Sequence, residues 1–426
     1  MPSIIEPSDD VDLRRYPYAT TLNNEFALFT LANRLPGTID RLLLDSSIGR
    51  TSWSRLSKIR ESLISQGRVP PLEQNPFFDE AVWKHISGSV KSWRSAPFIN
   101  FEYYLYYKVL EATGSYFHLE PTEPTKEQWI LASGDQSSDP FKTDKDYPAI
   151  GGNDKYWSAI EAAAKLRWKK PKKTQLKEAV FSSLYNNQRD ASQLRQFNIN
   201  FVHSGESRSD DLIKVDHSAH LVDALLSPET SRIDIVSDNF YHEFVSDLSL
   251  AETIIRTAGK KVNIWVKNVP SFVSDVTITD WERLKKDLLA SPALSECFKS
   301  VLDPSFFSVR SARHLDTHLS FSDALYPPQG IAPSAPLQEL FQHSHLIIIK
   351  GDLNYRKLVE DRLWEPTLAV RKTIDARIFC VRAVKSACVV GVDESEWPVT
   401  LDMLNASLPS LKNPRPDYNM IIQEFR

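Results

Sequence analysis

The sequence has few cysteines and no long apolar run. Only three cysteines occur in 426 residues (Cys297, Cys380 and Cys388), an odd number that argues against a disulfide framework and favours a reducing compartment. No stretch approaches the roughly eighteen consecutive apolar residues of a membrane-spanning helix, and the first residues lack the basic and apolar regions of a secretory signal. We therefore expect a soluble cytoplasmic protein, with the nucleus as an alternative location.

The chain also lacks an excess of charge of one sign. Its 51 basic and 55 acidic side chains give a net charge of −4, so neither nucleic acid nor a membrane is expected as a partner. The phosphate-binding loop G-x-x-x-x-G-K-[ST], the dinucleotide motif G-x-G-x-x-G and the hydrolase motif G-x-S-x-G are all missing. Any anion site must therefore be local and built without these motifs.

The hydrophobic pattern changes near residue 200. Before it, apolar residues recur at three- and four-residue spacings, which is typical of helices. After it, short β-branched runs alternate with helical segments, which predicts a mainly parallel sheet. We expect an α/β fold with a flexible tail over 1–16, an N-terminal helical bundle over 17–200 and an α/β/α domain with a Rossmann-like sheet over 201–426. The predicted strands cover residues 232–236, 260–266, 345–350, 377–381 and 387–392.

Polar side chains follow four of the predicted strands: Asp238 and Asn239, then Asp275, then Asp352, then Lys385. In open α/β sheets, ligands bind beyond the carboxyl ends of the strands. Two carboxylates and an amide oxygen form a hard site suited to Mg²⁺ or Mn²⁺, and neighbouring bases would hold a phosphate. An aspartate at a strand end is equally ordinary turn or helix-cap chemistry, so the pattern alone leaves both interpretations open.

Several segments resemble the metal-dependent damage-control phosphatases, in particular the eukaryotic sugar-phosphate branch, some members of which are also described as carboxyl methyltransferases. The most specific of these segments is KGDLNYRKL. The resemblance covers nearly the whole chain and implies an N-terminal helical bundle on an α/β/α domain. The matching segments are RLPGTIDRLL (34–43), FINFEYYLYYKVL (98–110), LYNNQRDASQL (184–194), SDN…E (237–243), VPSFVSDVT (269–277), KGDLNYRKL (350–358) and VRAVK (381–385).

The resemblance implies a divalent metal, with Mn²⁺, Co²⁺ or Ni²⁺ as the expected ion and Mg²⁺ as an alternative. It implies hydrolysis of a small phosphorylated metabolite, such as fructose 1-phosphate or fructose 6-phosphate. The implied metal ligands are Asp238, Asn239 and Asp275, and the implied catalytic residues are Asp238, Asp275 and Asp352. The implied substrate-binding residues are Asp238, Asn239, Asp352, Leu353, Asn354, Tyr355, Arg356 and Lys385.

Two other functions fit the same resemblance. One is an S-adenosylmethionine-dependent glutamate methyltransferase, with Glu102, Glu243 and Asp275 at the methyl-donor site, although no glycine-rich methyl-donor loop is present. S-adenosylmethionine is expected as a cofactor only in that case. The other is a non-catalytic metal-binding homologue, because Tyr241 stands where the branch usually has glycine and Ala383 where it usually has threonine.

Two pairs of histidines have the spacing of metal ligands: His217 with His220, and His314 with His318. Neither pair has the glutamate that follows the first histidine in a zinc hydrolase helix. We therefore expect surface or interface histidines in both places.

Overall fold

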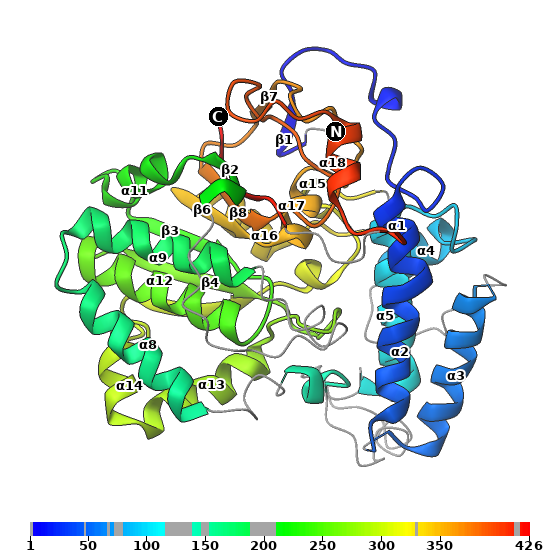
Figure 1. The fold of residues 1–426 in the computed structure, drawn as a ribbon, viewed down its shortest axis with the longest axis horizontal. Helices are drawn as coiled ribbons and strands as arrows, with labels where there is room; N and C mark the ends of the chain where they lie inside the picture. Colours follow the sequence, from blue (N-terminus) through cyan, green and yellow to red (C-terminus); the bar gives the residue numbers. More distant parts are fainter. Residues whose placement is uncertain are drawn as a thin grey trace.

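The computed structural model describes residues 3–46, 48–65, 69–71, 80–115, 139–145, 153–187, 210–328, 331–412 and 418–426. Figure 1 shows two parts: a group of N-terminal helices and, beside it, a sheet flanked by helices. This arrangement confirms the predicted α/β fold with a helical N-terminal part. No helix within the described ranges is long and apolar enough to cross a membrane.

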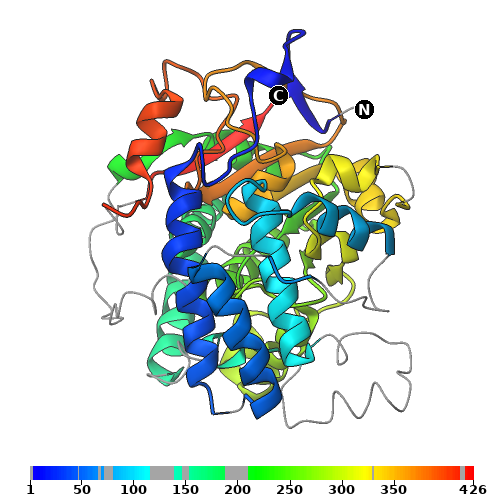
Figure 2. The same ribbon diagram turned by 90° about the vertical axis from the view of Figure 1, so that its right-hand side faces the viewer.

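The N-terminal helices pack around α5, whose side chains are almost all buried because apolar and aromatic residues lie on every side of it. This helix ends at Gly114, which has a φ of 71° and so allows a left-handed end. Figure 2 shows α2, α3 and α5 side by side. The helices of this part are α1 (Glu25–Phe29), the π-helix η2 (Thr30–Arg34), α2 (Leu35–Leu44), α3 (Arg50–Ile64), α4 (Glu80–Ser89) and α5 (Phe98–Thr113).

The main sheet has seven strands in the order β2-β9-β8-β6-β3-β4-β5, and every neighbouring pair is parallel except β8 and β9. The strand order reverses between β3 and β6, since β4 and β5 extend from one side and β8 from the other. Ligands bind at such a switch point in open α/β sheets. The strands are β2 (Ile213–Asp216), β3 (Arg232–Val236), β4 (Lys261–Val266), β5 (Phe307–Ser311), β6 (Leu346–Lys350), β8 (Arg377–Ala383) and β9 (Met420–Phe425).

Two hydrophobic cores lie on the two faces of this sheet. Along β6, Leu346 and Ile348 belong to one core and Ile347 and Ile349 to the other, as strand alternation requires. The first core is covered by α8 (Asn153–Arg167), α9 (Lys172–Asn187), α11 (Ser218–Leu226), α12 (His242–Ala258), α13 (Ile278–Ala290) and α14 (Pro292–Cys297). The second is covered by α15 (Phe321–Leu325), α16 (Ala335–His343), α17 (Asp352–Leu358), α18 (Leu401–Ser407) and the N-terminal helices.

The domain limits expected from the sequence differ from this packing in two places. The described residues of the expected tail, 3–16, are not free, because β1 (Ile5–Pro7) pairs with β7 (Val370–Lys372) and the neighbouring Ile4 is fully buried. The helix α9 packs on α12 and β8, and α8 packs on α9 and α14, although residues 17–200 were expected to form one helical bundle. The change from helical to sheet packing therefore comes before residue 153.

The predicted strand at 387–392 is wrong. The preceding strand β8 is already paired on both sides, with β6 and β9, so this apolar run cannot pair beside it. Its backbone instead bonds to side chains: Arg382 donates to the Cys388 oxygen at 2.7 Å, and Gln423 Nε2 donates to the Val390 oxygen at 2.8 Å. The run is thus a buried coil whose polar groups are satisfied without a ladder.

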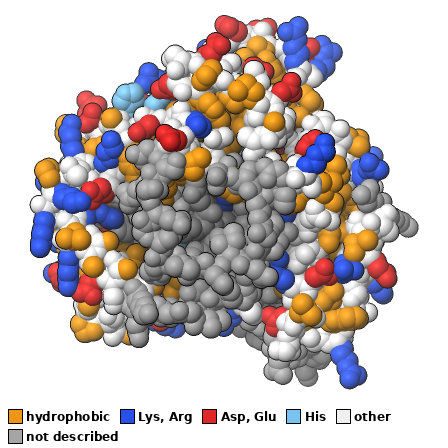
Figure 3. All heavy atoms as spheres, in the orientation of Figure 1, with side chains coloured by type: hydrophobic (Ala, Val, Ile, Leu, Met, Phe, Trp, Pro, Cys, Tyr) orange, Lys and Arg blue, Asp and Glu red, His pale blue; other side chains and the backbone are white. Residues whose placement is uncertain are grey.

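Charged side chains of both signs are interspersed over the described part of the face drawn in Figure 3. This mixture agrees with the small net charge. It gives this face no extended patch of one sign within the described residues.

Candidate active site

The ends of β3 and β6 bring two aspartates together at the switch point of the sheet. Asp238 follows β3 and Asp352 begins α17 directly after β6, and these two strands are paired in register. Asn354 links the two ends, because its Nδ2 donates to the Ser237 oxygen at 3.1 Å and to the Lys350 oxygen at 2.9 Å. The sequence after each strand therefore builds one continuous edge.

The segment after β4 folds back and places Asp275 at the same edge. The amide of Val276 donates to the Asp238 oxygen at 3.1 Å, and Asn239 and Asp275 form an isolated antiparallel bridge. Ser274 Oγ donates to Asn239 Oδ1 at 2.6 Å, and the Phe272 amide donates to Asp275 Oδ2 at 2.8 Å. These bonds hold the three predicted metal ligands beside one another.

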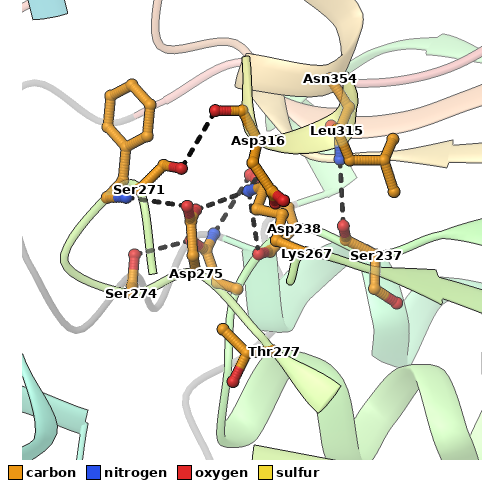
Figure 4. Close-up of polar contacts among 12 residues, drawn as sticks. Ser237, Asp238, Lys267, Ser271, Ser274, Asp275, Thr277, Leu315, Asp316 and Asn354 are labelled. Carbon is orange, nitrogen blue, oxygen red and sulfur yellow. Dashed lines mark hydrogen bonds and ion pairs between the residues drawn. The ribbon is translucent and has the colours of Figure 1, made fainter. Parts of the chain in front are cut away.

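Lys267 lies between the two carboxylates, as Figure 4 shows. Its Nζ is 2.5 Å from Asp275 Oδ1 and 3.2 Å from Asp238 Oδ1, and the side chain is only 1% exposed. Burial opposes the charge of this ammonium, but the two aspartates outweigh burial and raise the pKa of Lys267. Burial also raises the pKa of Asp275 to about 6, even though Lys267 lowers it.

Gly351 lets Asp238 approach the start of α17. Its φ is +80°, and a Cβ placed there would lie 2.0 Å from Asp238 Oδ2. Only glycine meets both requirements, because other residues rarely adopt this backbone and would overlap the carboxylate. Asp352 is then fixed by the Arg382 guanidinium and the Lys385 amide, each 3.0 Å from its Oδ1.

A pocket of about 70 Å³ opens at this edge and is lined by residues of both parts of the chain. Eight of the residues predicted from the sequence line it: Glu102, Asp238, Asn239, Asp275, Asp352, Leu353, Arg356 and Lys385. Three do not: Glu243, Asn354 and Tyr355. Lining residues that the prediction did not include are Phe26, Arg34, Tyr106, Phe272, Val273 and Ser274.

Tyr355 is a core residue and not a substrate contact. Its ring is fully buried beneath the guanidinium of Arg382, whose carbon is 3.5 Å from the ring centroid. Its hydroxyl accepts from the Val390 amide at 3.1 Å and lies 3.2 Å from Gln423 Oε1. The α17 helix therefore turns Tyr355 away from the pocket and Leu353 towards it.

Replacing Tyr355 with phenylalanine is expected to lower stability by about 1–3 kcal/mol, because the buried Val390 amide loses its acceptor. Denaturant unfolding measures this loss. The KM of the folded variant for any substrate should be unchanged. A raised KM with unchanged stability would contradict this placement.

Arg356 links the two parts of the chain. Its Nη1 is 2.9 Å from Glu102 Oε2 on α5, and its Nε and Nη2 are 2.7 and 3.0 Å from the two carboxylate oxygens of Asp361. Burial raises the pKa of Glu102, and Arg356 followed by Arg34 partly offsets that rise. Arg356 lines the pocket but most of its donors are already bonded to carboxylates.

Glu243 lies behind Asn239 and outside the pocket lining. Its Oε2 accepts from Asn239 Nδ2 at 2.9 Å, and burial raises its pKa to about 8. Glu102 lies on α5, is paired with Arg356 and lines the pocket together with Asp275. The predicted methyl-donor trio of Glu102, Glu243 and Asp275 is therefore not gathered around one pocket.

Tyr241 occupies a backbone position that favours glycine, with φ 67° and ψ −98°. Its ring stacks on Tyr156 of α8, with centroids 5.6 Å apart, and it does not line the pocket. Ala383 is likewise fully buried in β8, in the core beneath α9 and α12. The two positions at which the sequence departs from the family pattern, Tyr241 and Ala383, thus lie outside the pocket lining.

The histidine pairs make other contacts. His217 accepts from the Glu424 amide at 2.9 Å and contacts Glu396, while His318 contacts His85 at 2.8 Å. The side chain of His314 lies outside the described residues. Over the ranges that the structure describes, no three His, Cys, Asp or Glu side chains are grouped as a metal site.

The fold and the pocket together define an α/β protein whose switch point carries an acidic, base-lined pocket closed by an N-terminal helical part. The chain belongs to the family of the damage-control phosphatase ARMT1-like domain, whose family model matches residues 31–396. It is therefore a member of a phosphatase family.

Relatives carrying the name damage-control phosphatase ARMT1 are similar over different lengths. The bovine protein is 31% identical over 188 residues, 42% of this chain and 41% of that protein, so this match spans less than half of the relative. The zebrafish protein is 27% identical over 80% of this chain and 79% of its own length. The human protein is 26% identical over 84% of this chain and 83% of its own length.

Among solved structures, a DUF89 family protein from Pyrococcus horikoshii matches 92% of this chain and 96% of its own. The sequence identity is 15% and the TM-score is 0.44.

Proposed function

We propose that this protein is a divalent-metal-dependent phosphatase that hydrolyses small sugar phosphates, with fructose 1-phosphate and fructose 6-phosphate as the first candidates. The observation that carries the proposal is the convergence of Asp238, Asn239, Asp275, Asp352 and Lys385 on one pocket at the switch point. Carboxylates suit a metal, and a lysine beside them suits the phosphoryl group that the metal would bind. Membership of a phosphatase family supports the same reaction.

The residues of this edge fit a divalent cation. Asp238, Asn239 and Asp275 offer only oxygen ligands, which Mg²⁺ and Mn²⁺ prefer. The Lys267 ammonium already lies between the two carboxylates, so the geometry is one that holds positive charge. A bound metal would polarise the phosphoryl oxygen and lower the pKa of a bound water.

Asp352 is suited to move a proton during hydrolysis. Its Oδ1 accepts hydrogen bonds from the Arg382 guanidinium and the Lys385 amide. Its Oδ2 has no hydrogen-bond partner among the described residues, and the side chain lines the pocket. The reaction transfers the phosphoryl group to water and returns one proton to the leaving sugar oxygen. In this proposal Lys385 holds the phosphoryl group and Asp352 carries the proton.

The test is release of inorganic phosphate from both fructose phosphates, with and without Mn²⁺. We expect Mn²⁺-dependent release by the wild-type protein and a loss of at least about 100-fold in Asp238→Asn. Asp223→Asn is a matched control, since Asp223 is exposed, is paired with Lys173 and does not line the pocket. Release that persists in Asp238→Asn and in excess chelator would contradict the proposal.

A further inference from the structure

The N-terminal helices contribute a wall to the pocket that the proposed reaction leaves unassigned. Phe26, Arg34, Glu102 and Tyr106 line the same pocket as the aspartates and Lys385. Glu102 is bonded to Arg356, so its role in joining the two parts is accounted for. Phe26 and Arg34 have no such role, although Arg34 opens the segment RLPGTIDRLL, which resembles the family.

Arg34 is held at the pocket by local structure. It is the last residue of the π-helix Thr30–Arg34, and single π turns within helices often occur at functional sites. Its guanidinium lies over the Phe26 ring, with the central carbon 5.4 Å from the ring centroid. Its Nη1 also donates to Thr30 Oγ1 at 3.3 Å.

Most N–H donors of Arg34 make no hydrogen bond to a described residue, whereas those of Arg356 are bonded to carboxylates. Arg356 is bonded through Nε, Nη1 and Nη2 to the carboxylates of Asp361 and Glu102. Arg34, by contrast, makes no ion pair within 4.0 Å with any residue that the structure describes, and its hydrogen bond to Thr30 uses one nitrogen. A guanidinium presents several N–H donors in a fixed fork, so most of those of Arg34 remain for a ligand.

We propose that Arg34 determines specificity by donating hydrogen bonds to the hydroxyl oxygens of the substrate's organic part, while Phe26 and Tyr106 pack on its carbon skeleton. This inference rests on the proposed function, in which Lys385 and the strand ends hold the phosphoryl group. The lining residues of the N-terminal helices then contact the part of the substrate that is away from the phosphoryl group. The substrate class is a polyhydroxylated phosphate ester in preference to an aryl phosphate, since an aryl group offers no oxygens to Arg34.

The experiment compares fructose 6-phosphate with phenyl phosphate, whose ring carries no further oxygen, as substrates of the full chain in Mn²⁺. We expect Arg34→Gln to lower kcat/KM for fructose 6-phosphate by about 10- to 100-fold, mainly through KM, which is the range for a charged hydrogen bond. For the aryl phosphate we expect a loss of less than about threefold. Arg34→Lys should fall between, because lysine keeps the charge and loses the fork.

Arg41→Gln is the matched control. Arg41 lies on α2, contacts Asp144 and the Gly37 oxygen, and does not line the pocket, so neither substrate should be affected in the folded variant. Equal losses for both substrates in Arg34→Gln, or no loss for the sugar phosphate, would overturn the inference while leaving the proposed function intact. Failure of the wild-type protein to hydrolyse either substrate would overturn both.

Discussion

Replacing Gly351 with alanine is expected to destabilise the protein and to lower the proposed phosphatase activity strongly. The new Cβ would lie 2.0 Å from Asp238 Oδ2 and 2.5 Å from its Cγ, so the carboxylate or the strand end must move. The φ of +80° adds backbone strain of about 1–3 kcal/mol for any residue other than glycine. We expect the free energy of unfolding to fall by at least about 2 kcal/mol, measured by denaturant titration, and hydrolysis to fall by about 100-fold or more.

Gly259→Ala separates strain from the clash with Asp238. Gly259 has a φ of +66° at the end of α12, and a Cβ there would meet nothing within 4 Å. This control should lose stability through strain alone and keep its activity when folded. If Gly351→Ala retained full activity, the close approach of Asp238 to Gly351 would not matter for the site.

Replacing Lys267 with methionine is expected to have the second large effect. Without the ammonium, Asp238 and Asp275 are two buried carboxylates close to each other with no positive charge between them. Breaking a buried ion pair in this way costs about 3–5 kcal/mol. We expect that loss in metal-free unfolding experiments, and a larger stabilisation by Mn²⁺ in the variant than in the wild type because the metal would supply the missing charge.

Lys145→Met is the matched control for this variant. Lys145 is also a buried ammonium between two carboxylates, 2.6 Å from Asp139 Oδ2 and 2.8 Å from Asp280 Oδ2, but it does not line the pocket. The Lys145→Met variant should be destabilised about as much as Lys267→Met and should retain hydrolysis when folded. Equal activity in folded Lys267→Met and Lys145→Met would contradict a role for Lys267 in the site.

The sheet could be predicted where the strands are continuous apolar runs. The runs at β3, β4, β6 and β8 identify buried parallel strands because both faces of each are covered. The same reasoning fails at 387–392, where the composition is that of a strand but the preceding strand β8 is already paired on both sides. Composition alone does not report whether a pairing partner exists.

The carboxylates of the candidate site could be predicted from the sequence, but the residues that hold them in place could not. The aspartates follow strands, so their position along the chain indicates the edge to which they belong. Lys267 also follows a strand directly, and that position was the available signal for it. Gly351 contacts Asp238, and Arg34 lines the pocket, only because the fold brings together segments that are far apart in the sequence. A local sequence pattern does not contain this information.

Tyr355 shows the opposite error. It belongs to the segment KGDLNYRKL, and the resemblance assigns residues 352–356 of that segment to the substrate pocket. A helix turns successive side chains in different directions, so Leu353 and Arg356 line the pocket while Tyr355 enters the core. A motif therefore predicts the segment, and the helix geometry decides which of its members can touch a ligand.

Anomalous diffraction from crystals grown with Mn²⁺ and inorganic phosphate tests the central claim most directly. We expect one strong manganese peak coordinated by Asp238, Asn239 and Asp275, with the phosphate beside Lys385. Crystals of Asp238→Asn grown in the same way should show a weaker peak or none. A manganese ion bound elsewhere, with this edge of the sheet empty, would contradict the account.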